Sequence, residues 1–246
     1  MTDIVTRIGA YWDRAAATYE QAQGHHPQTA LEWAAWRGVL GRLLPPPPAR
    51  VLDVGAGTGI LSLAAAQLGH TVTAVDLAPA MLERLLASAA AEGLEVIAVT
   101  GRADELPAGS WDAVVSRHLL WTLPDPLGAL RCWRAAAPDG RLVLLDSLWG
   151  DAADPLERAR ARAGNWLWQM RGTHHGHDGH YDDAMRAALP LASGTTPERL
   201  VDLVTAAAWR APRIERLVDI EWAMARQKPW PDRLLGVNTT FAVVAR

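Results

Sequence analysis

Short apolar runs alternate with helical stretches through the middle of the chain. The runs predict strands at Val51–Val54, Thr71–Val75, Leu94–Val99, Trp111–Ser116 and Arg141–Asp146, and the stretches between them predict helices at Ile60–Leu68, Pro79–Ala91 and about Asp125–Ala137. Short strands that alternate with helices of this length are typical of a parallel sheet covered on both faces. We therefore predict an α/β fold with a doubly wound, mostly parallel sheet.

Less regular segments flank this region. Residues 1–20 and about His26–Leu44 predict two helices, the second ending at the four prolines 45–48. After Trp149 the alternation breaks, and residues 150–194 have the character of an insertion, partly helical through Leu156–Met170. A helix at Pro197–Trp209 and strands near Arg213–Val218 and Thr239–Ala245 complete the pattern. We divide the chain into an N-terminal helical cap (1–48), an α/β core (49–149), an inserted lid or substrate segment (150–195) and the remainder of the core (196–246).

Composition and charge narrow the class of partner. Half of the 246 residues are hydrophobic, enough to bury a full core. The net charge of −3 provides no field that would gather nucleic acid or anionic lipid, so a small-molecule partner is favoured. Cys132 is the only cysteine, which excludes an intrachain disulfide. The N-terminal residues are charged where a signal peptide is apolar, and no apolar run reaches membrane-spanning length, so we expect a cytoplasmic protein with no membrane partner. We expect it to be a monomer or a homodimer.

A glycine-rich turn follows the first strand, in the stretch VLDVGAGTG. Gly55, Gly57 and Gly59 can adopt positive φ and let a ligand lie against bare backbone, while the next helix directs unpaired N–H groups at the same place. Such turns bind nucleotide-like ligands. The dinucleotide pattern G-x-G-x-x-G is not met, which weakens a nicotinamide reading, and the absence of Gly-Lys-Ser/Thr excludes a P-loop.

Polar residues at later strand ends extend the candidate site. Asp76, at the end of the second strand, is placed to accept hydrogen bonds from both hydroxyls of a ribose, with a solvated strand-end carboxylate as the alternative. His118 follows the fourth strand and titrates in the range of a general base, or is a histidine bonded to nearby backbone. Arg117 either binds a substrate carboxylate or pairs with an acidic neighbour.

Five motifs follow one another between about Arg50 and Asp146: VLDVGAGTG, AVDLAPAML, GRADELP, WDAVVSRHLLWTLPDPLGAL and PDGRLVLLD. As an ordered set they resemble the motifs of class I S-adenosylmethionine-dependent methyltransferases of the small-molecule type. The resemblance implies a Rossmann-like, seven-stranded sheet, with S-adenosyl-L-methionine as cofactor and S-adenosyl-L-homocysteine as product. The chain departs from the family at Arg102, where an acidic residue is common, so Asp104 is the expected acidic contact to adenine.

The resemblance also implies which residues contact the cofactor. Those implied are Asp53, Gly55, Ala56, Gly57 and Gly59 for the methionine part, Asp76 for the ribose, Leu77, Ala103 and Asp104 for the adenine, and Ser116 on the floor near the sulfonium. Met81 and Tyr19 complete the expected cofactor set. Tyr11, Trp12 and Tyr19 resemble an N-terminal helix that closes over the cofactor.

The remaining candidates concern the acceptor. We expect His118 to act as base or substrate anchor, and the substrate to contact Tyr11, Arg117, His118, Trp121, Trp149, His174 and Tyr181. Aromatic faces near a sulfonium would stabilise its charge, with ordinary packing as the alternative. The stretch His174–His180 is rich in histidine, but adjacent histidines on a glycine-rich loop lack the geometry of a helical zinc pair, so we expect no metal and a loop over the pocket or in solvent.

These observations predict methyl transfer from S-adenosylmethionine to an oxygen, nitrogen or carbon atom of a small metabolite, for which the tryptophan-rich flanking segments indicate an aromatic or heterocyclic body. Two alternatives stay open at this point, an NAD(P)-dependent oxidoreductase and a non-catalytic cofactor-binding module. A nucleic-acid substrate is disfavoured by the acidic charge balance and by Ser116-Arg117-His118-Leu119, which stands where a base-holding segment would be expected.

Overall fold

The predicted alternation folds into a single sheet in the computed structural model, which describes residues 4–21, 24–149, 155, 158–160, 163, 181–228, 230–233 and 235–246. Across the described residues the sheet has seven strands, in the order β3 (Val96–Thr100), β2 (Thr71–Asp76), β1 (Arg50–Val54), β4 (Ala113–Arg117), β5 (Arg141–Ser147), β7 (Thr240–Ala245) and β6 (Arg213–Arg216). The first five are parallel, and β7 runs antiparallel to both β5 and β6. The prediction of a doubly wound, seven-stranded sheet is confirmed.

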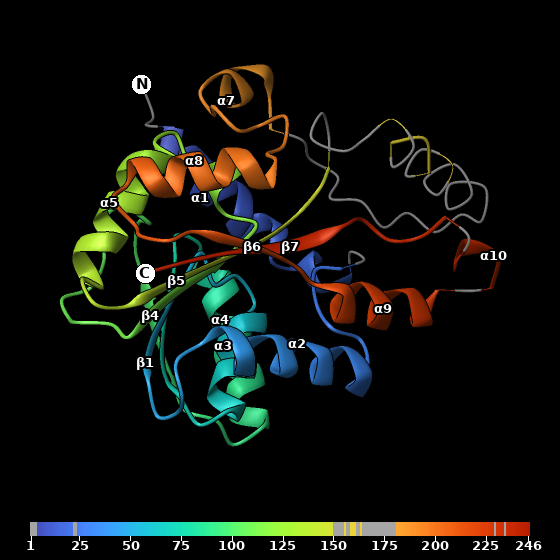
Figure 1. The fold of residues 1–246 in the computed structure, drawn as a ribbon, viewed down its shortest axis with the longest axis horizontal. Coiled ribbons are helices and arrows are strands. Elements are labelled where there is room, and N and C mark those ends of the chain that lie inside the picture. The colour runs from blue at the N-terminus through green and yellow to red at the C-terminus, as the bar shows by residue number, and fades with distance from the viewer. Residues whose placement is uncertain are drawn as a thin grey trace.

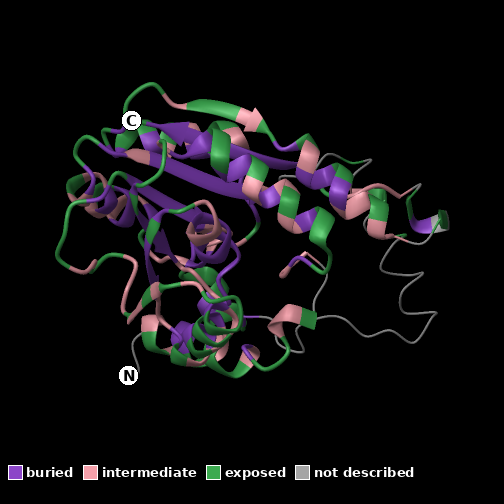
Figure 2. Ribbon diagram, turned by 90° about the horizontal axis from the view of Figure 1, so that it is seen from below, coloured by how far each residue is buried: buried purple, intermediate pink, exposed green. Residues whose placement is uncertain are grey.

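Helices cover both faces of this sheet (Figure 1). One face is packed by α2 (Ala30–Leu43), α3 (Ile60–Gln67), α4 (Pro79–Ala91) and α9 (Val218–Gln227), and the other by α5 (Pro126–Ala136) and α8 (Pro197–Ala206). Side chains therefore meet apolar neighbours on either side of the central strands, which explains why these strands read as continuous apolar runs. All six residues of β7 are buried, and Figure 2 shows the sheet as the buried centre of the molecule.

Shorter elements lie beside the carboxyl ends of the parallel strands. They are α1 (Ile4–Ala15), the 3-10 turns Tyr19–Gln21 and Leu120–Thr122, and α7 (Asp183–Ala187), while α10 (Trp230–Arg233) follows α9. Ile8 of α1 and Met185 of α7 belong to one small apolar cluster, so segments far apart in the sequence pack together here. Strand order reverses between β1 and β4, which is the point where open α/β sheets bind ligands.

Several boundaries differ from the sequence prediction. β3 begins at Val96 and β4 extends from Ala113 to Arg117, so both strands start two residues later than predicted. The strand predicted near Arg213–Val218 ends at Arg216, and α9, which starts at Val218, was not predicted. The reason is that α9 buries few residues, Ile220, Glu221 and Ala223, and its apolar pattern is correspondingly weak. The predicted helical part Leu156–Met170 lies outside the described residues, apart from isolated positions.

The second N-terminal helix belongs to the sheet's own packing. Trp36, Leu40 and Leu43 of α2 are buried against α3 and the sheet, and α2 also packs along α9. Arg42 of α2 donates hydrogen bonds to Glu215 of β6 (2.7 Å) and Asp219 of α9 (2.7 Å). The cap drawn from the sequence as residues 1–48 thus contains one helix over the strand ends, α1, and one helix in a face layer, α2.

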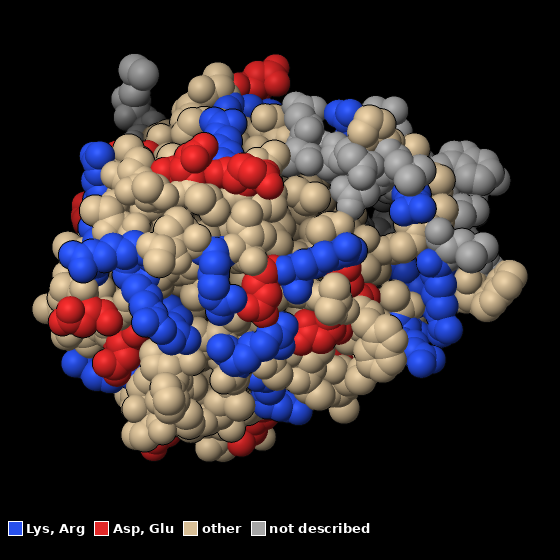
Figure 3. Space-filling model, in the orientation of Figure 1, with Lys and Arg blue, Asp and Glu red and all other residues tan. Residues whose placement is uncertain are grey.

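The surface carries mixed charge. On the face drawn in Figure 3, arginine and lysine side chains alternate with carboxylates and no broad region of one sign is seen. The longest described helix is α2, with 14 residues, and no helix of the described chain has the length and apolar character needed to cross a bilayer.

Candidate functional site

The glycine turn between β1 and α3 has the predicted conformation. Gly55, Gly57 and Gly59 have φ of +70°, +55° and +95°, a region that residues with a side chain rarely adopt. The amides of Gly55 and Ala56 donate to the carbonyl of Val75 at the end of β2, at 2.8 and 3.1 Å. A Cβ on Gly55 would lie 2.7 Å from Leu119 Cδ1, whereas one on Gly57 would meet only Tyr19, at 3.9 Å. The turn thus leaves open space above Gly57.

Asp76 fixes this turn from the end of β2. Its Oδ2 accepts a hydrogen bond from the Gly57 amide at 2.8 Å, and its Oδ1 accepts one from the Ala78 amide at 2.9 Å. Burial raises the pKa of Asp76, and these backbone hydrogen bonds oppose the shift. Because each carboxylate oxygen has two lone pairs, both oxygens keep capacity for a ligand hydroxyl.

Asp53 lies beneath the turn. Only 1% of it is exposed, and Ser62 Oγ of α3 donates to its Oδ2 at 2.6 Å. Burial raises the pKa of Asp53 to about 7, while the hydrogen bond from Ser62 lowers it. Ser116 is likewise buried, and its hydroxyl donates to the Val54 carbonyl at 2.8 Å. These two residues support the turn and the end of β1 from inside, and their predicted contact with the cofactor stays a prediction.

A cavity of about 320 Å³ opens at the turn, and we call it the glycine-turn cavity. Its lining includes the following predicted cofactor residues: Tyr19, Gly55, Gly57, Asp76, Leu77, Met81, Ala103 and Asp104. Ala56 and Gly59 contribute to the turn without lining the cavity. Asp104 is held by its neighbour Arg102, whose Nε and Nη2 donate to the two carboxylate oxygens at 2.9 and 2.8 Å. The hydrogen bonds from Arg102 lower the pKa of Asp104, and both residues line the cavity.

A second cavity, of about 570 Å³, adjoins the first. Aromatic rings dominate its wall, from Tyr11, Trp12, Tyr19, Trp36, Trp121, Trp149 and Tyr181, and we call it the ring cavity. Several of these rings meet edge to face, with centroids 5.0 Å apart for Tyr11 and Tyr181 and 5.2 Å apart for Trp121 and Trp149. Trp12 Nε1 donates to the Tyr181 hydroxyl at 2.7 Å, which ties α1 to the segment before α7. Of the predicted substrate residues, Tyr11, Arg117, His118, Trp121, Trp149 and Tyr181 line this cavity.

Four residues line both cavities: Trp12, Tyr19, Arg117 and His118. His118 directly follows β4 and has φ of +53°, a strained backbone for a residue with a side chain. Its Nδ1 lies 2.7 Å from Asp146 Oδ1 at the end of β5, and its own amide donates to the Leu145 carbonyl at 3.1 Å. Since a carboxylate only accepts, Nδ1 carries the proton and Nε2 is left as an acceptor. The side chain of His118 is 26% exposed and that of Asp146 is 5% exposed, so a ligand in the cavity would contact the histidine and not the carboxylate.

Arg117 is enclosed beside this pair. Its guanidinium carbon lies 5.1 Å from the Trp36 ring centroid, and its Nη2 donates to the Gly24 carbonyl. Burial lowers the pKa of Arg117, and the charges of Asp146 and Asp53 oppose that shift from a distance. No ion pair joins Arg117 to any described carboxylate, so the reading in which it pairs with an acidic neighbour has no support among these residues.

The predicted substrate residue His174, with the whole stretch His174–His180, lies outside the described residues. Within the described part of the chain, no group of three or more histidine, cysteine, aspartate or glutamate side chains is arranged to hold a metal ion. The expectation that the protein needs no metal stays a prediction.

Asp146, Trp36 and Lys228 are among the site residues that the sequence did not predict. Asp146 lies on β5, and the sequence alone does not show that β5 is the neighbour of β4. The register of these two strands pairs Arg117 with Leu145, which places His118 and Asp146 side by side. Trp36 appeared only as part of a helix pattern. Lys228 lines the ring cavity from the end of α9, an element that the sequence did not predict.

Comparisons with known proteins agree with this geometry. A family model described as a methyltransferase domain matches residues 26–186. An uncharacterized methyltransferase of Mycobacterium bovis is 30% identical over 209 residues, which cover 79% of this chain and 75% of that protein. The chain belongs to this methyltransferase family. The predicted methyltransferase family is thereby confirmed, and the oxidoreductase alternative receives no support.

Other relatives of this methyltransferase match in part or by fold alone. A ubiquinone biosynthesis O-methyltransferase of Xanthomonas campestris is 47% identical over 103 residues, which span 40% of this chain and only 43% of that relative's length. The solved magnesium protoporphyrin IX methyltransferase of Synechocystis with bound S-adenosylmethionine is 15% identical, with a TM-score of 0.62 over 100% of this chain and 98% of that one. A [4+2]-cyclase is equally similar, with a TM-score of 0.63 over 97% and 94%. The fold is therefore shared by proteins with different reactions.

Proposed function

We propose that this methyltransferase transfers the methyl group of S-adenosylmethionine to a hydroxyl or amine of a small, ring-bearing metabolite, with His118 as the general base. One observation carries the proposal: His118 lines both cavities and is hydrogen-bonded through Nδ1 to the buried Asp146. A base at the meeting point of two compartments is placed where an acceptor from one would face a methyl donor in the other.

The glycine-turn cavity suits the cofactor chemically. The space above Gly57, the carboxylate of Asp76 and the apolar side chains of Leu77 and Met81 offer a polar end for a ribose and an apolar slot for a base. When bound, S-adenosylmethionine supplies an electrophilic methyl group on a positively charged sulfur. The aromatic rings of Trp12 and Tyr19, which line both cavities, would favour a positive charge at their junction.

The chain's own residues provide positioning and one proton acceptor. When bound, S-adenosylmethionine would supply the methyl group to the acceptor atom and leave as S-adenosylhomocysteine, and His118 Nε2 would take the acceptor's proton. Asp146 holds the imidazole in the required tautomer and stabilises the imidazolium that results. The aromatic walls of the ring cavity would orient a flat substrate, whose binding displaces water from them. We also propose a cytoplasmic, monomeric or homodimeric protein that acts on small molecules rather than on nucleic acid.

The proposal is tested with the cofactor product and a panel of acceptors. S-adenosylhomocysteine at about a hundred times its dissociation constant should stabilise the protein by about 2.7 kcal/mol, while NAD should leave the melting temperature unchanged. On hydroxylated aromatics and aromatic amines, we expect S-adenosylhomocysteine to accumulate. His118→Ala should lower turnover about 10²-fold to 10⁴-fold, and Asp146→Asn should lower it less, with cofactor binding unchanged in both variants.

Two results would contradict this reading. Normal turnover of His118→Ala on an accepted substrate would remove the histidine from the mechanism. Tight binding of S-adenosylhomocysteine without transfer to any acceptor of the panel would favour the non-catalytic binding module instead.

A further inference from the structure

The permanently charged side chains that line the ring cavity all carry positive charge among the described residues. Among the described residues that line it, three carry permanent positive charge, Arg117, Arg186 and Lys228, and none is an aspartate or glutamate. Its other walls are mostly aromatic or apolar. A cavity with this distribution of charge binds a cation poorly and favours a ligand with negative charge.

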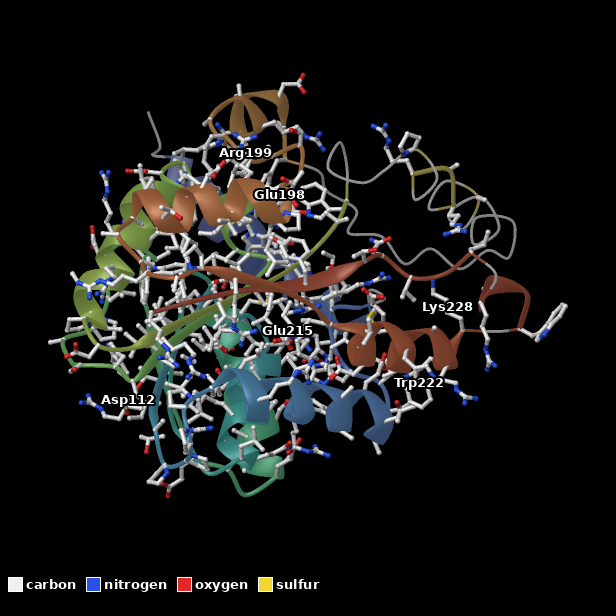
Figure 4. All side chains as sticks on the ribbon, in the orientation of Figure 1. Asp112, Glu198, Arg199, Glu215, Trp222 and Lys228 are labelled. Atoms are coloured by element: carbon white, nitrogen blue, oxygen red, sulfur yellow. The ribbon has the colours of Figure 1, made fainter. Side chains whose placement is uncertain are left out.

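Lys228 is distinctive among these cations. It is the only lysine of the sequence, in which every other permanently charged basic side chain is an arginine. It lies at the C-terminal end of α9, on the other side of the helix from the exposed Trp222 (Figure 4). Unlike Arg117 and His118, it lines the ring cavity without lining the glycine-turn cavity. A role for Lys228 would therefore concern the acceptor and not the cofactor.

The ammonium group of Lys228 has donors left over. Nζ donates one hydrogen bond, to the Gly236 carbonyl at 2.6 Å, and no ion pair joins it to a described carboxylate. Burial lowers the pKa of Lys228, and the more distant charge of Asp232 opposes that shift. An ammonium has three donors, so two remain for a partner at the cavity. A partly buried charge of this kind costs free energy unless a counter-charge arrives.

The other two cations, Arg117 and Arg186, already contact neighbouring residues of the protein. Arg117 stacks on Trp36 and bonds to Gly24, and it faces both cavities. Arg186 is exposed and its Nε donates to the Tyr181 carbonyl at 3.1 Å. Arg186, like Lys228, lines the ring cavity and not the glycine-turn cavity. Its side chain is exposed, so Lys228 is the half-buried cation that faces the ring cavity alone.

We propose that the acceptor of this methyltransferase is an aromatic or similarly flat acid, and that Lys228 binds its ionised acidic group while the methylated hydroxyl or amine lies at His118. This inference rests on the proposed function and adds the substrate class. The aromatic walls hold the body of the molecule, and the charge at the end of α9 fixes which way round it enters. Lys228 acts as a specificity and positioning residue, with no part in the bond changes.

The test compares hydroxylated aromatic acids with their neutral primary amides, such as 3,4-dihydroxybenzoate with its amide and 4-hydroxycinnamate with its amide. We expect acids of the panel to be methylated with a lower KM than their amides. Lys228→Met should raise the KM of an acid about ten-fold or more and leave kcat and the amide's KM nearly unchanged, because only the charged contact is lost. Lys228→Arg should restore much of the affinity.

Arg226→Met is the matched control. Arg226 also lies on α9, with its guanidinium 5.0 Å from the Trp222 ring on the outer surface, and its removal changes the net charge equally. This variant should behave like the unaltered protein. If Arg226→Met and Lys228→Met raise the KM alike, or if acids and amides respond alike to Lys228→Met, the inference is overturned.

The single lysine allows a second test that needs no turnover. In a brief reaction with acetic anhydride, acetylation of the Lys228 peptide is measured by mass spectrometry, with the chain's α-amine as internal reference. With S-adenosylhomocysteine bound, an aromatic acid should slow acetylation of Lys228 about five-fold or more, and its amide should not. Equal protection by acid and amide, or protection by neither, contradicts the inference. Failure of S-adenosylhomocysteine to bind at all would instead contradict the proposed function, so the two outcomes are distinguishable.

Discussion

Gly59 and Gly93 both have positive φ, yet they stand in different surroundings. An added Cβ on Gly59 would lie 2.5 Å from Leu85 Cγ, whereas one on Gly93 would meet nothing within 4 Å. Gly93→Ala should therefore cost only the backbone strain, about 1–2 kcal/mol. Gly59→Ala should cost this strain plus overpacking against Leu85, about 1–3 kcal/mol more. Urea denaturation of the two variants measures the difference, and equal losses would show that Leu85 yields without cost.

Asp53 makes stability depend on pH in the direction opposite to that of a salt-bridged carboxylate. Burial raises its pKa to about 7 in the folded protein, so the folded state keeps a proton that the unfolded state has lost. This residue's contribution therefore falls as pH rises from about 4 to about 7 and is constant above that. Asp53→Asn should remove the loss, and between pH 5 and pH 8 its stability should gain on the unaltered protein by on the order of 2 kcal/mol. Parallel stability curves, obtained by urea titration, would contradict the assignment.

At the scale of elements, α1 is held over the strand ends by contacts with the segment around α7. Trp12 Nε1 donates to the Tyr181 hydroxyl, and Arg7 pairs with Asp182. Because α1 packs mainly on α4 and on this small cluster, it should open independently of the sheet.

Tyr181→Phe tests this independence, since it removes the hydroxyl and leaves the ring. We expect faster amide hydrogen exchange in α1, with exchange in β1 and β4 unchanged, and a loss of about 0.5–1.5 kcal/mol in local opening free energy. Exchange measured by mass spectrometry decides the matter. An increase spread evenly over the sheet would mean that α1 opens only with the whole molecule.

At the scale of the whole molecule, the parts that the sequence predicted are those encoded locally. The glycine turn, the parallel strands and the two carboxylates Asp53 and Asp76 follow from short patterns with a period or a spacing. Asp146 and Lys228 could not be found in this way. The first depends on β4 and β5 being neighbours, and the second on a weakly amphipathic helix packed beside β7, and both are facts of long-range topology.

The same distinction applies to the two cavities. The cofactor side is built mainly from the segments that follow β1, β2, β3 and β4, so most of its residues stand out along the sequence. The ring cavity combines side chains from α1, α2, α7, α9 and the loops between them. No short pattern joins such distant positions. Trp149 and Tyr181 were proposed because they border or lie in the predicted inserted segment, whereas Trp36 fitted the pattern of a packed helix and was not proposed.

The place of β7 in the sheet has a consequence for the order of assembly. β5 ends at Ser147, and its second neighbour does not begin until Thr240, so one side of β5 waits for a partner far along the chain. Closing so long a loop is slow compared with forming the consecutive β1 to β5 units. During that interval a bare strand edge is available to other chains. Refolding at low protein concentration, where two unfolded copies meet less often, should therefore give more native protein and less aggregate.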